Sequence, residues 1–184
     1  MATPSSTESR APGTLRIHSV EWADPRAVAL RDAMAAELHG RYAEWIAAAA
    51  KDGDGDALAD DIDPGIVAHT VIAELDGEPV GHATLIRSRA PAHAGELEVK
   101  RVFSDDRIRR RGVSKALLTA LETWAAEQGA PRVILATGPK QPEAVALYRR
   151  TGYTAIPSFA PEPWTAHVFC FEKRLGVVSA GPAG

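Results

Sequence analysis

The sequence predicts a mixed α/β domain whose central sheet is mostly antiparallel and carries helices on both faces. Most strand-like segments are joined by short connections, of which Asp76-Gly77 is the tightest. The exception is a helical segment from Gly112 to Gly129 that separates two strand-like segments. Such a βαβ unit makes its two strands parallel. Further helical patterns lie before and after this unit, so both faces of the sheet can be covered.

The first elements are a short strand and a helical region. Residues 14–20 alternate apolar and polar side chains, as a strand does. Asp24-Pro25 then supplies a helix N-cap followed by proline at the first helical position. Apolar residues follow at helical spacing: Ala27, Leu30, Met34 and Leu38. A second helical piece covers 41–51, and the sequence leaves open whether Gly40 divides the two pieces.

The remaining elements follow equally local signals. Gly129 and Pro131 end the helix that starts at Gly112, while Pro142 opens another helix that Gly152 ends. The segment 132–137 is apolar throughout, which is typical of a strand buried on both faces. The predicted later strands are 66–75, 79–87, 96–103, 132–137, 153–157 and 166–175.

Composition limits the class of protein. The 184 residues are 45% hydrophobic and 24% charged with a net charge of −3, which predicts one soluble domain and disfavours a nucleic-acid partner. A single cysteine, Cys170, fits a reducing compartment, and no apolar run is long enough for a membrane span. We therefore expect a cytoplasmic protein with its domain at 14–175, between a disordered lead (1–13) and a flexible tail (176–184). A homodimer is one of the oligomeric states left open.

A basic cluster surrounds the start of the helix at Gly112. Its members are Arg107, Arg109, Arg110, Arg111 and Lys115. A helix N-terminus carries unpaired N–H groups and partial positive charge, and a glycine lets a phosphate approach the backbone. The pattern therefore predicts a pyrophosphate site. Neither G-x-G-x-x-G nor a Walker loop is present, so the common nucleotide motifs do not explain it.

The acidic run 52–63 has a weak likeness to a calcium-binding loop, with aspartates at alternate positions 52, 54 and 56. Ala57 stands where that loop needs glycine, and Asp63 stands where it needs a bidentate glutamate. We interpret the run as a solvated loop. Three histidines on predicted strands also lack metal-ligand spacing: His69, His82 and His167. No metal is therefore expected.

The segment RRRGVS, residues 109–114, resembles the [QR]-x-x-G-x-[GA] motif of the GNAT N-acetyltransferases, which binds the pyrophosphate of acetyl-CoA. Its surroundings resemble the family too. EVKRVFS (98–104) resembles the strand before the motif, and 135–153 resembles the next strand and helix. The resemblance covers roughly 14–175, in pattern only over the first eighty residues. It implies the GNAT fold, with a splayed parallel strand pair, and acetyl-CoA as co-substrate.

The resemblance also implies site residues. Those that would contact acetyl-CoA are Val102, Phe103, Ser104, Arg109, Arg110, Arg111, Gly112, Val113, Ser114, Lys115, Gln141, Ala144 and Tyr148. Tyr148 would act as general acid at the CoA sulfur, and Glu98 would serve as base, directly or through water. Ser114 replaces the motif's final glycine or alanine, and Gln141 stands where the family often has asparagine.

The implied reaction is transfer of acetyl from acetyl-CoA to an amine of a small molecule or protein, by direct attack in a ternary complex. Such attack needs a deprotonated amine and no cysteine nucleophile. A non-catalytic acyl-CoA sensor is the alternative, since it would keep the pyrophosphate site without needing Glu98 or Tyr148. A nucleic-acid binder using the arginines is disfavoured by net charge. Glu98 could also pair only with Lys100 or Arg101, and Tyr148 could belong only to the core.

Overall fold

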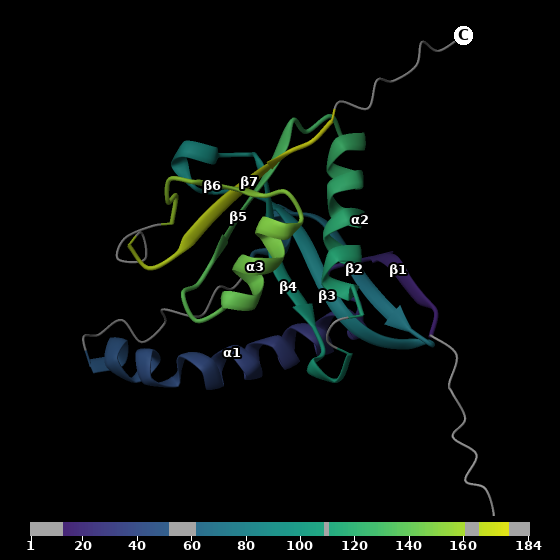
Figure 1. The fold of residues 1–184 in the computed structure, drawn as a ribbon, viewed down its shortest axis with the longest axis horizontal. Coiled ribbons are helices and arrows are strands. Elements are labelled where there is room, and N and C mark those ends of the chain that lie inside the picture. Colours follow the sequence, from purple (N-terminus) through teal and green to yellow (C-terminus); the bar gives the residue numbers. More distant parts are fainter. Residues whose placement is uncertain (1–12, 52–61, 109–110, 161–165, 177–184) are drawn as a thin grey trace, which may run out of the picture.

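A seven-stranded sheet forms the centre of the molecule, and helices cover both of its faces (Figure 1). The computed structural model describes residues 13–51, 62–108, 111–160 and 166–176. Its elements are β1 (Leu15–Val20), α1 (Pro25–Lys51), η1 (Pro64–Ile66), β2 (Val67–Leu75), β3 (Glu78–Arg87), η2 (Pro91–His93), β4 (Leu97–Ser104), η3 (Asp106–Ile108), α2 (Val113–Glu127), β5 (Arg132–Thr137), α3 (Pro142–Arg150), β6 (Thr154–Ile156) and β7 (Phe169–Arg174). The strand order is β1-β2-β3-β4-β5-β7-β6, and of these described strands only β4 and β5 pair in parallel. This confirms the predicted fold class.

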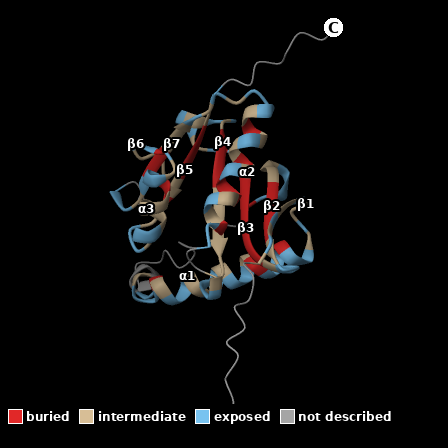
Figure 2. Ribbon diagram, turned by 45° about the vertical axis from the view of Figure 1, so that its right-hand side comes forward, coloured by how far each residue is buried: buried red, intermediate tan, exposed pale blue. Residues whose placement is uncertain are grey.

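Different helices cover the two faces. Val71 of β2 lies in the buried cluster that contains Leu117 of α2 and Tyr148 of α3. The next residue, Ile72, points to the opposite face because side chains alternate along a strand. There it packs against Leu30 of α1. Figure 2 shows buried residues concentrated on the central strands and on α2, so the main core lies between them.

Local signals place several elements where the sequence predicts them. Asp76 and Gly77 have φ values of 54° and 86°, and a two-residue hairpin turn of type I′ needs two such positive values. The carboxylate of Asp24 accepts a hydrogen bond of 2.8 Å from the N–H of Arg26, as expected of an N-cap. Gly129, with φ of 77°, follows the end of α2.

The helical region after Asp24 is one helix, α1, which runs through Gly40 without a break. The sequence had left this open. A glycine inside a helix costs about 1 kcal/mol relative to alanine. Buried side chains on α1, Leu30 before Gly40 and Tyr42 after it, offset that cost because each buries apolar surface against the rest of the fold. Tertiary packing, which spacing alone does not reveal, therefore decides the continuity of α1.

β4 changes its pairing partway along its length. It pairs with β5 only at Glu98 and Val99, after which the two strands separate. Just beyond, Lys100 pairs with Thr84 of β3, and Phe103 pairs with His82. Two β4 residues, 101 and 102, therefore lie opposite the single β3 residue between Thr84 and His82. This is a β-bulge, and its first residue, Arg101, has a φ of 56°. The bulge and the separation confirm the predicted splayed pair.

Some predictions fall on residues that the structure does not describe. The lead (1–13) and the tail (176–184) lie outside the described residues apart from Gly13 and Gly176, and most of the acidic run 52–63 does too. Its last residue, Asp63, is described. Asp63 caps η1, because its carboxylate accepts a hydrogen bond of 2.8 Å from the N–H of Gly65. It also pairs with Arg89 at 2.5 Å.

The buried histidine His82 should make the stability of the fold depend on pH. His82 of β3 is 0% exposed, and desolvation lowers its pKa from 6.5 to about 4. Folding therefore favours the neutral form of the ring. The contribution of His82 to the free energy of unfolding is complete above pH 6.5 and is lost as the pH falls toward 4. The difference in unfolding free energy between wild type and His82→Asn should shrink by about 3 kcal/mol over this range. Urea denaturation measures it, and parallel pH curves for the two proteins would contradict the assignment.

Candidate functional site

A cavity of about 880 Å³ lies between α1, the end of β4, the start of α2, and α3. Its lining residues are Met34, Glu37, Leu38, Arg41, Val102, Phe103, Ser104, Asp106, Ile108, Gly112, Val113, Ser114, Lys115, Gln141, Glu143, Ala144, Ala146, Leu147, Tyr148, Arg150 and Thr151. Ten of the thirteen positions implied to contact acetyl-CoA are among them. Arg111 is exposed and does not line the cavity, while Arg109 and Arg110 lie outside the described residues.

The start of α2 forms one end of the cavity. Gly112 adopts a left-handed conformation with φ of 78°, and no side chain caps the helix there. The first helical hydrogen bond runs from the N–H of Ala116 to the carbonyl of Gly112, so the preceding amides have no helical partner. Ser114 donates a 3.0 Å hydrogen bond to the hydroxyl of Ser104, which ties α2 to β4. An anion at this point would meet free N–H groups and the positive end of the helix.

A glycine on β3 leaves room for the start of α2 and the end of β4 to lie close beside that strand. A Cβ built at Gly81 would come within 2.8 Å of Cγ1 of Val113 and 2.9 Å of the carbonyl oxygen of Phe103. Both distances are shorter than side chains tolerate. A side chain at position 81 would therefore clash with both the start of α2 and the end of β4.

The third wall is α3, which carries Tyr148 at the cavity. The Tyr148 ring contacts the rings of Tyr153, at 5.6 Å between centroids, and Phe171, at 6.0 Å. The side chain is only 6% exposed, and this burial raises the pKa of Tyr148 well above its usual value. Its hydroxyl is therefore protonated at neutral pH and able to donate.

The fourth wall, α1, was not predicted to belong to the site. Met34 and Leu38 lie on the apolar stripe of this helix, where helical spacing predicts core packing. Arg41, one turn later, pairs with Glu37 at 2.5 Å and also with Glu143 of α3. These ion pairs connect two walls of the cavity. Periodicity cannot distinguish a stripe that packs on the core from one that borders a cavity, so no sequence signal was available.

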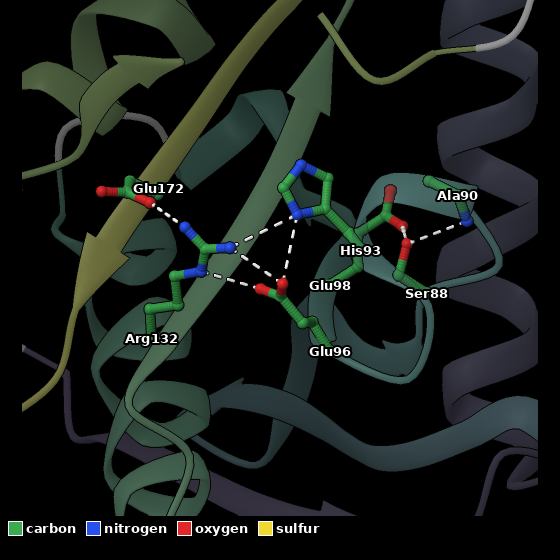
Figure 3. A network of polar contacts seen from close by, with 7 residues as sticks. All are labelled: Ser88, Ala90, His93, Glu96, Glu98, Arg132 and Glu172. Carbon is green, nitrogen blue, oxygen red and sulfur yellow. Dashed lines mark hydrogen bonds and ion pairs between the residues drawn. The ribbon is translucent and has the colours of Figure 1, made fainter. Parts of the chain in front are cut away.

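Glu98 lies apart from this cavity. Its carboxylate is buried and accepts a 2.8 Å hydrogen bond from the hydroxyl of Ser88, which in turn accepts one from the N–H of Ala90 (Figure 3). Lys100 pairs with its other oxygen at 3.2 Å. The structure therefore brings Tyr148 to the cavity with the implied cofactor positions but leaves Glu98 outside its lining.

A second polar network in Figure 3 ties strands together. Arg132 of β5 donates two hydrogen bonds of 2.8 Å to Glu96 and one of 2.5 Å to Glu172 of β7. His93 lies 3.2 Å from the Glu96 carboxylate. The hydrogen bonds from Arg132 hold the pKa of Glu96 below its usual value. We interpret this network as structural, because every charge in it is paired.

The described residues hold no group of three or more His, Cys, Asp or Glu side chains arranged to bind a metal. His69 instead stacks on Trp124, and His167 contacts Trp45 edge-on. Within the same described ranges, none of the helices combines the length and apolar character needed to cross a bilayer.

The sequence profile of the acetyltransferase (GNAT) family matches residues 17–153, which include β2 to β5, α1 to α3 and the residues that line the cavity. The chain belongs to the GNAT family. Human N-acetyltransferase 8 is 35% identical over 83 residues, which make up 45% of this chain and 34% of that protein. Rat N-acetyltransferase family 8 member 2 is 32% identical over 83 residues, or 45% and 37% of the two chains. The match thus spans little more than a third of each relative.

Solved GNAT-like structures match over a larger share of the chain. A candidate acyl-CoA N-acyltransferase of Klebsiella pneumoniae is 26% identical with a TM-score of 0.65, over 88% of this chain and 98% of that one. A GNAT acetyltransferase of Elizabethkingia anophelis, solved with acetyl-CoA bound, has a TM-score of 0.57 at 14% identity over the same shares, and shows the likeness of fold. Both likenesses agree with the fold described above, in which β4 separates from β5 beyond Val99 and borders the cavity.

Proposed function

We propose that this GNAT protein transfers an acetyl group from acetyl-CoA to the nitrogen of an amine by direct attack in a ternary complex. One observation carries the proposal. A single cavity joins an uncapped helix start, the part of β4 that has left β5, and the buried hydroxyl-bearing side chain of Tyr148. These would supply an anion site, a free strand edge and a proton donor for a CoA thioester.

The pyrophosphate of acetyl-CoA would bind at the start of α2. Backbone N–H groups from Arg110 to Lys115 would face it, and the positive end of the helix favours its charge. The Lys115 side chain is exposed at the cavity and adds a cation. Arg109 and Arg111 would contribute to the same basic surroundings. Gln141 and Ala144 would contact the cofactor from the α3 side.

The pantetheine arm would lie along Val102, Phe103 and Ser104. These residues line the cavity, and β4 no longer pairs with β5 beyond Val99. A free strand edge offers backbone donors and acceptors, and the amides of pantetheine can use them as an added strand would. This arrangement would direct the thioester toward the point where the two strands separate.

Tyr148 would donate a hydrogen bond to the departing thiolate and then protonate it. Burial raises the pKa of Tyr148, so the phenol is a weak acid. The same dry surroundings raise the proton affinity of a thiolate, which keeps donor and acceptor matched. The interaction would exist mainly in the transition state, where negative charge develops on sulfur.

Glu98 would receive the amine proton through water. Its two carboxylate oxygens are held by Ser88 and Lys100, and its side chain does not line the cavity. A carboxylate so placed can orient a water chain that reaches the amine. These contacts favour the water-mediated form of the role over direct contact.

If Glu98 is the base, Glu98→Gln should lower kcat/KM for the amine by about 100-fold. The acidic limb of the pH–rate profile should also change, because the amine's own titration would then control it. Steady-state kinetics across pH measures both effects. Glu96→Gln is the matched control, since Glu96 lies two residues away in the Arg132 network. Equal kinetics for the two variants would leave Glu98 with a structural role only.

A panel of amines tested with acetyl-CoA, with release of free thiol as the signal, tests the function itself. We expect turnover with at least one class of small-molecule or peptide amine. Propionyl-CoA and longer thioesters in parallel assays test whether acetyl is the preferred group. If calorimetry detects acetyl-CoA binding but no amine releases thiol, the protein is an acyl-CoA sensor and the proposal fails.

A further inference from the structure

His82 and the bulge in β4 form a connected unit that the proposed mechanism has not used. The Nδ1 atom of His82 lies 3.0 Å from the carbonyl oxygen of Arg101. Arg101 is the first residue of the bulge, and its φ of 56° lies in the left-handed region that residues other than glycine rarely adopt. The contact therefore lies at the most strained point of β4. Two residues earlier, β4 and β5 have their last paired position.

The other side of the His82 ring faces an arginine. Nη1 of Arg31 lies 3.4 Å from Nε2 of His82. The guanidinium itself is fixed, because it donates a 2.8 Å hydrogen bond to the carbonyl of Trp22 and lies over the Trp22 ring, with its Cζ 3.6 Å from the ring centroid. A series of contacts thus connects Trp22, before α1, through Arg31 of α1 and His82 of β3 to the bulge in β4.

These partners determine the tautomer of His82. A carbonyl oxygen can only accept, so Nδ1 must carry the proton. A guanidinium can only donate, so Nε2 must present its lone pair. Desolvation by burial, together with the charges of Arg31 and Arg101, lowers the pKa of His82 to about 4 and keeps the ring neutral. Both ring nitrogens are therefore used in one orientation.

We propose that His82 is a positioning residue that holds the Arg101 carbonyl and thereby aims the N–H of Val102 into the slot between β4 and β5. The C=O of Arg101 and the N–H of Val102 belong to one planar trans peptide unit and point in opposite directions. The His82 ring lies on the α1 face of the sheet, against Arg31, and the Arg101 carbonyl points toward this ring. The N–H of Val102 therefore points away from the ring. Val102 lines the cavity.

The inference rests on the proposed acetyl transfer, for which it supplies a donor to the reacting carbonyl. When an amine attacks a thioester, negative charge develops on the carbonyl oxygen, and a fixed N–H donor stabilises it. A donor that is free to rotate stabilises the oxyanion less, because it must reorganise as the charge develops. His82 would thus raise kcat through Val102 without touching the substrate.

Three substitutions separate this role from simple core packing. His82→Asn keeps an N–H donor near the position of Nδ1, His82→Gln moves the donor to the position of Nε2, and His82→Leu removes it. We expect the leucine and glutamine variants to lose about tenfold or more in kcat, against the 100-fold typical of losing such a donor outright. Asparagine should restore most of kcat, and the Kd for acetyl-CoA should change less than kcat in all three.

His69→Leu is the matched control, since it removes a histidine from the neighbouring strand that stacks on Trp124 and does not line the cavity. It should keep kcat even if the melting temperature falls. If kcat per folded molecule is unchanged in every His82 variant, or follows melting temperature rather than donor position, His82 is structural and the proposal is wrong.

A second measurement is independent of turnover. Nitrogen-15 NMR of histidine-labelled protein distinguishes the two neutral tautomers, and we expect His82 to show a protonated Nδ1 at pH 7. A protonated Nε2 would overturn the proposal even in an active enzyme. If wild type shows the expected tautomer but transfers no acetyl group to any amine, the proposed function fails, and with it the catalytic role of His82.

Discussion

Replacing Gly112 with glutamate should abolish detectable binding of acetyl-CoA while the protein keeps its fold. The new carboxylate would stand at the helix start where we propose that the pyrophosphate binds, and such like-charge contacts cost several kcal/mol, or roughly 100-fold or more in Kd. The fold should survive because an added Cβ at Gly112 meets no atom within 4 Å. Isothermal titration calorimetry and circular dichroism measure the two properties.

The matched control is Gly129→Glu. Gly129 has nearly the same left-handed φ, 77° against 78°, and an added Cβ there also meets no atom within 4 Å. Gly129 lies beyond the far end of α2. The control variant therefore has the same backbone strain as Gly112→Glu but places no charge at the proposed pyrophosphate site. Unchanged acetyl-CoA affinity in a folded Gly112→Glu protein would contradict the proposal that the pyrophosphate binds at the start of α2.

Replacing Tyr148 with phenylalanine should lower kcat by about 100-fold with little change in acetyl-CoA affinity. The hydroxyl would be lost from a ring whose packing against Tyr153 and Phe171 remains. In the proposed mechanism the lost interaction is with a charge that forms only in the transition state, so binding should be spared. Single-turnover kinetics, which isolates the chemical step, is the appropriate measurement.

Tyr153→Phe is the control for this experiment. Tyr153 is equally buried and its ring contacts Tyr148, but it does not line the cavity. It should keep kcat, while any loss of stability from removing a buried hydroxyl appears in both variants. A Tyr148→Phe enzyme with wild-type kcat, where chemistry limits turnover, would contradict the proposed mechanism.

The fold was largely predictable because its signals are local. The turn at Asp76-Gly77, the apolar strand 132–137 and the glycine at the start of α2 each specify structure within a few residues of themselves. The proposed cofactor positions came from the resemblance of the short motif at that helix start, and of the segments on either side of it, to the GNAT family. The continuity of α1 through Gly40 was not predictable in this way, because distant packing offsets the local cost of glycine.

The rest of the site depends on contacts between distant segments. Arg41 meets Glu143 across about a hundred residues of sequence, and His82 meets the Arg101 carbonyl across a strand pair. Neither side chain carries a motif. Glu98 was placed by resemblance, yet whether it faces the cavity depends on the pairing with Ser88 and Lys100. Such relations come from the register of strands and the packing of helices.

Transfer of isotope-labelled acetyl from acetyl-CoA tests the central claim most directly. The measurement follows the label by NMR and by mass spectrometry of both the amine and the intact protein. Direct attack predicts that the label appears as an amide on the amine nitrogen, with one free thiol per amide and an unmodified protein. Label found on the protein, for example at Cys170, or thiol release without a labelled amide, would contradict the account.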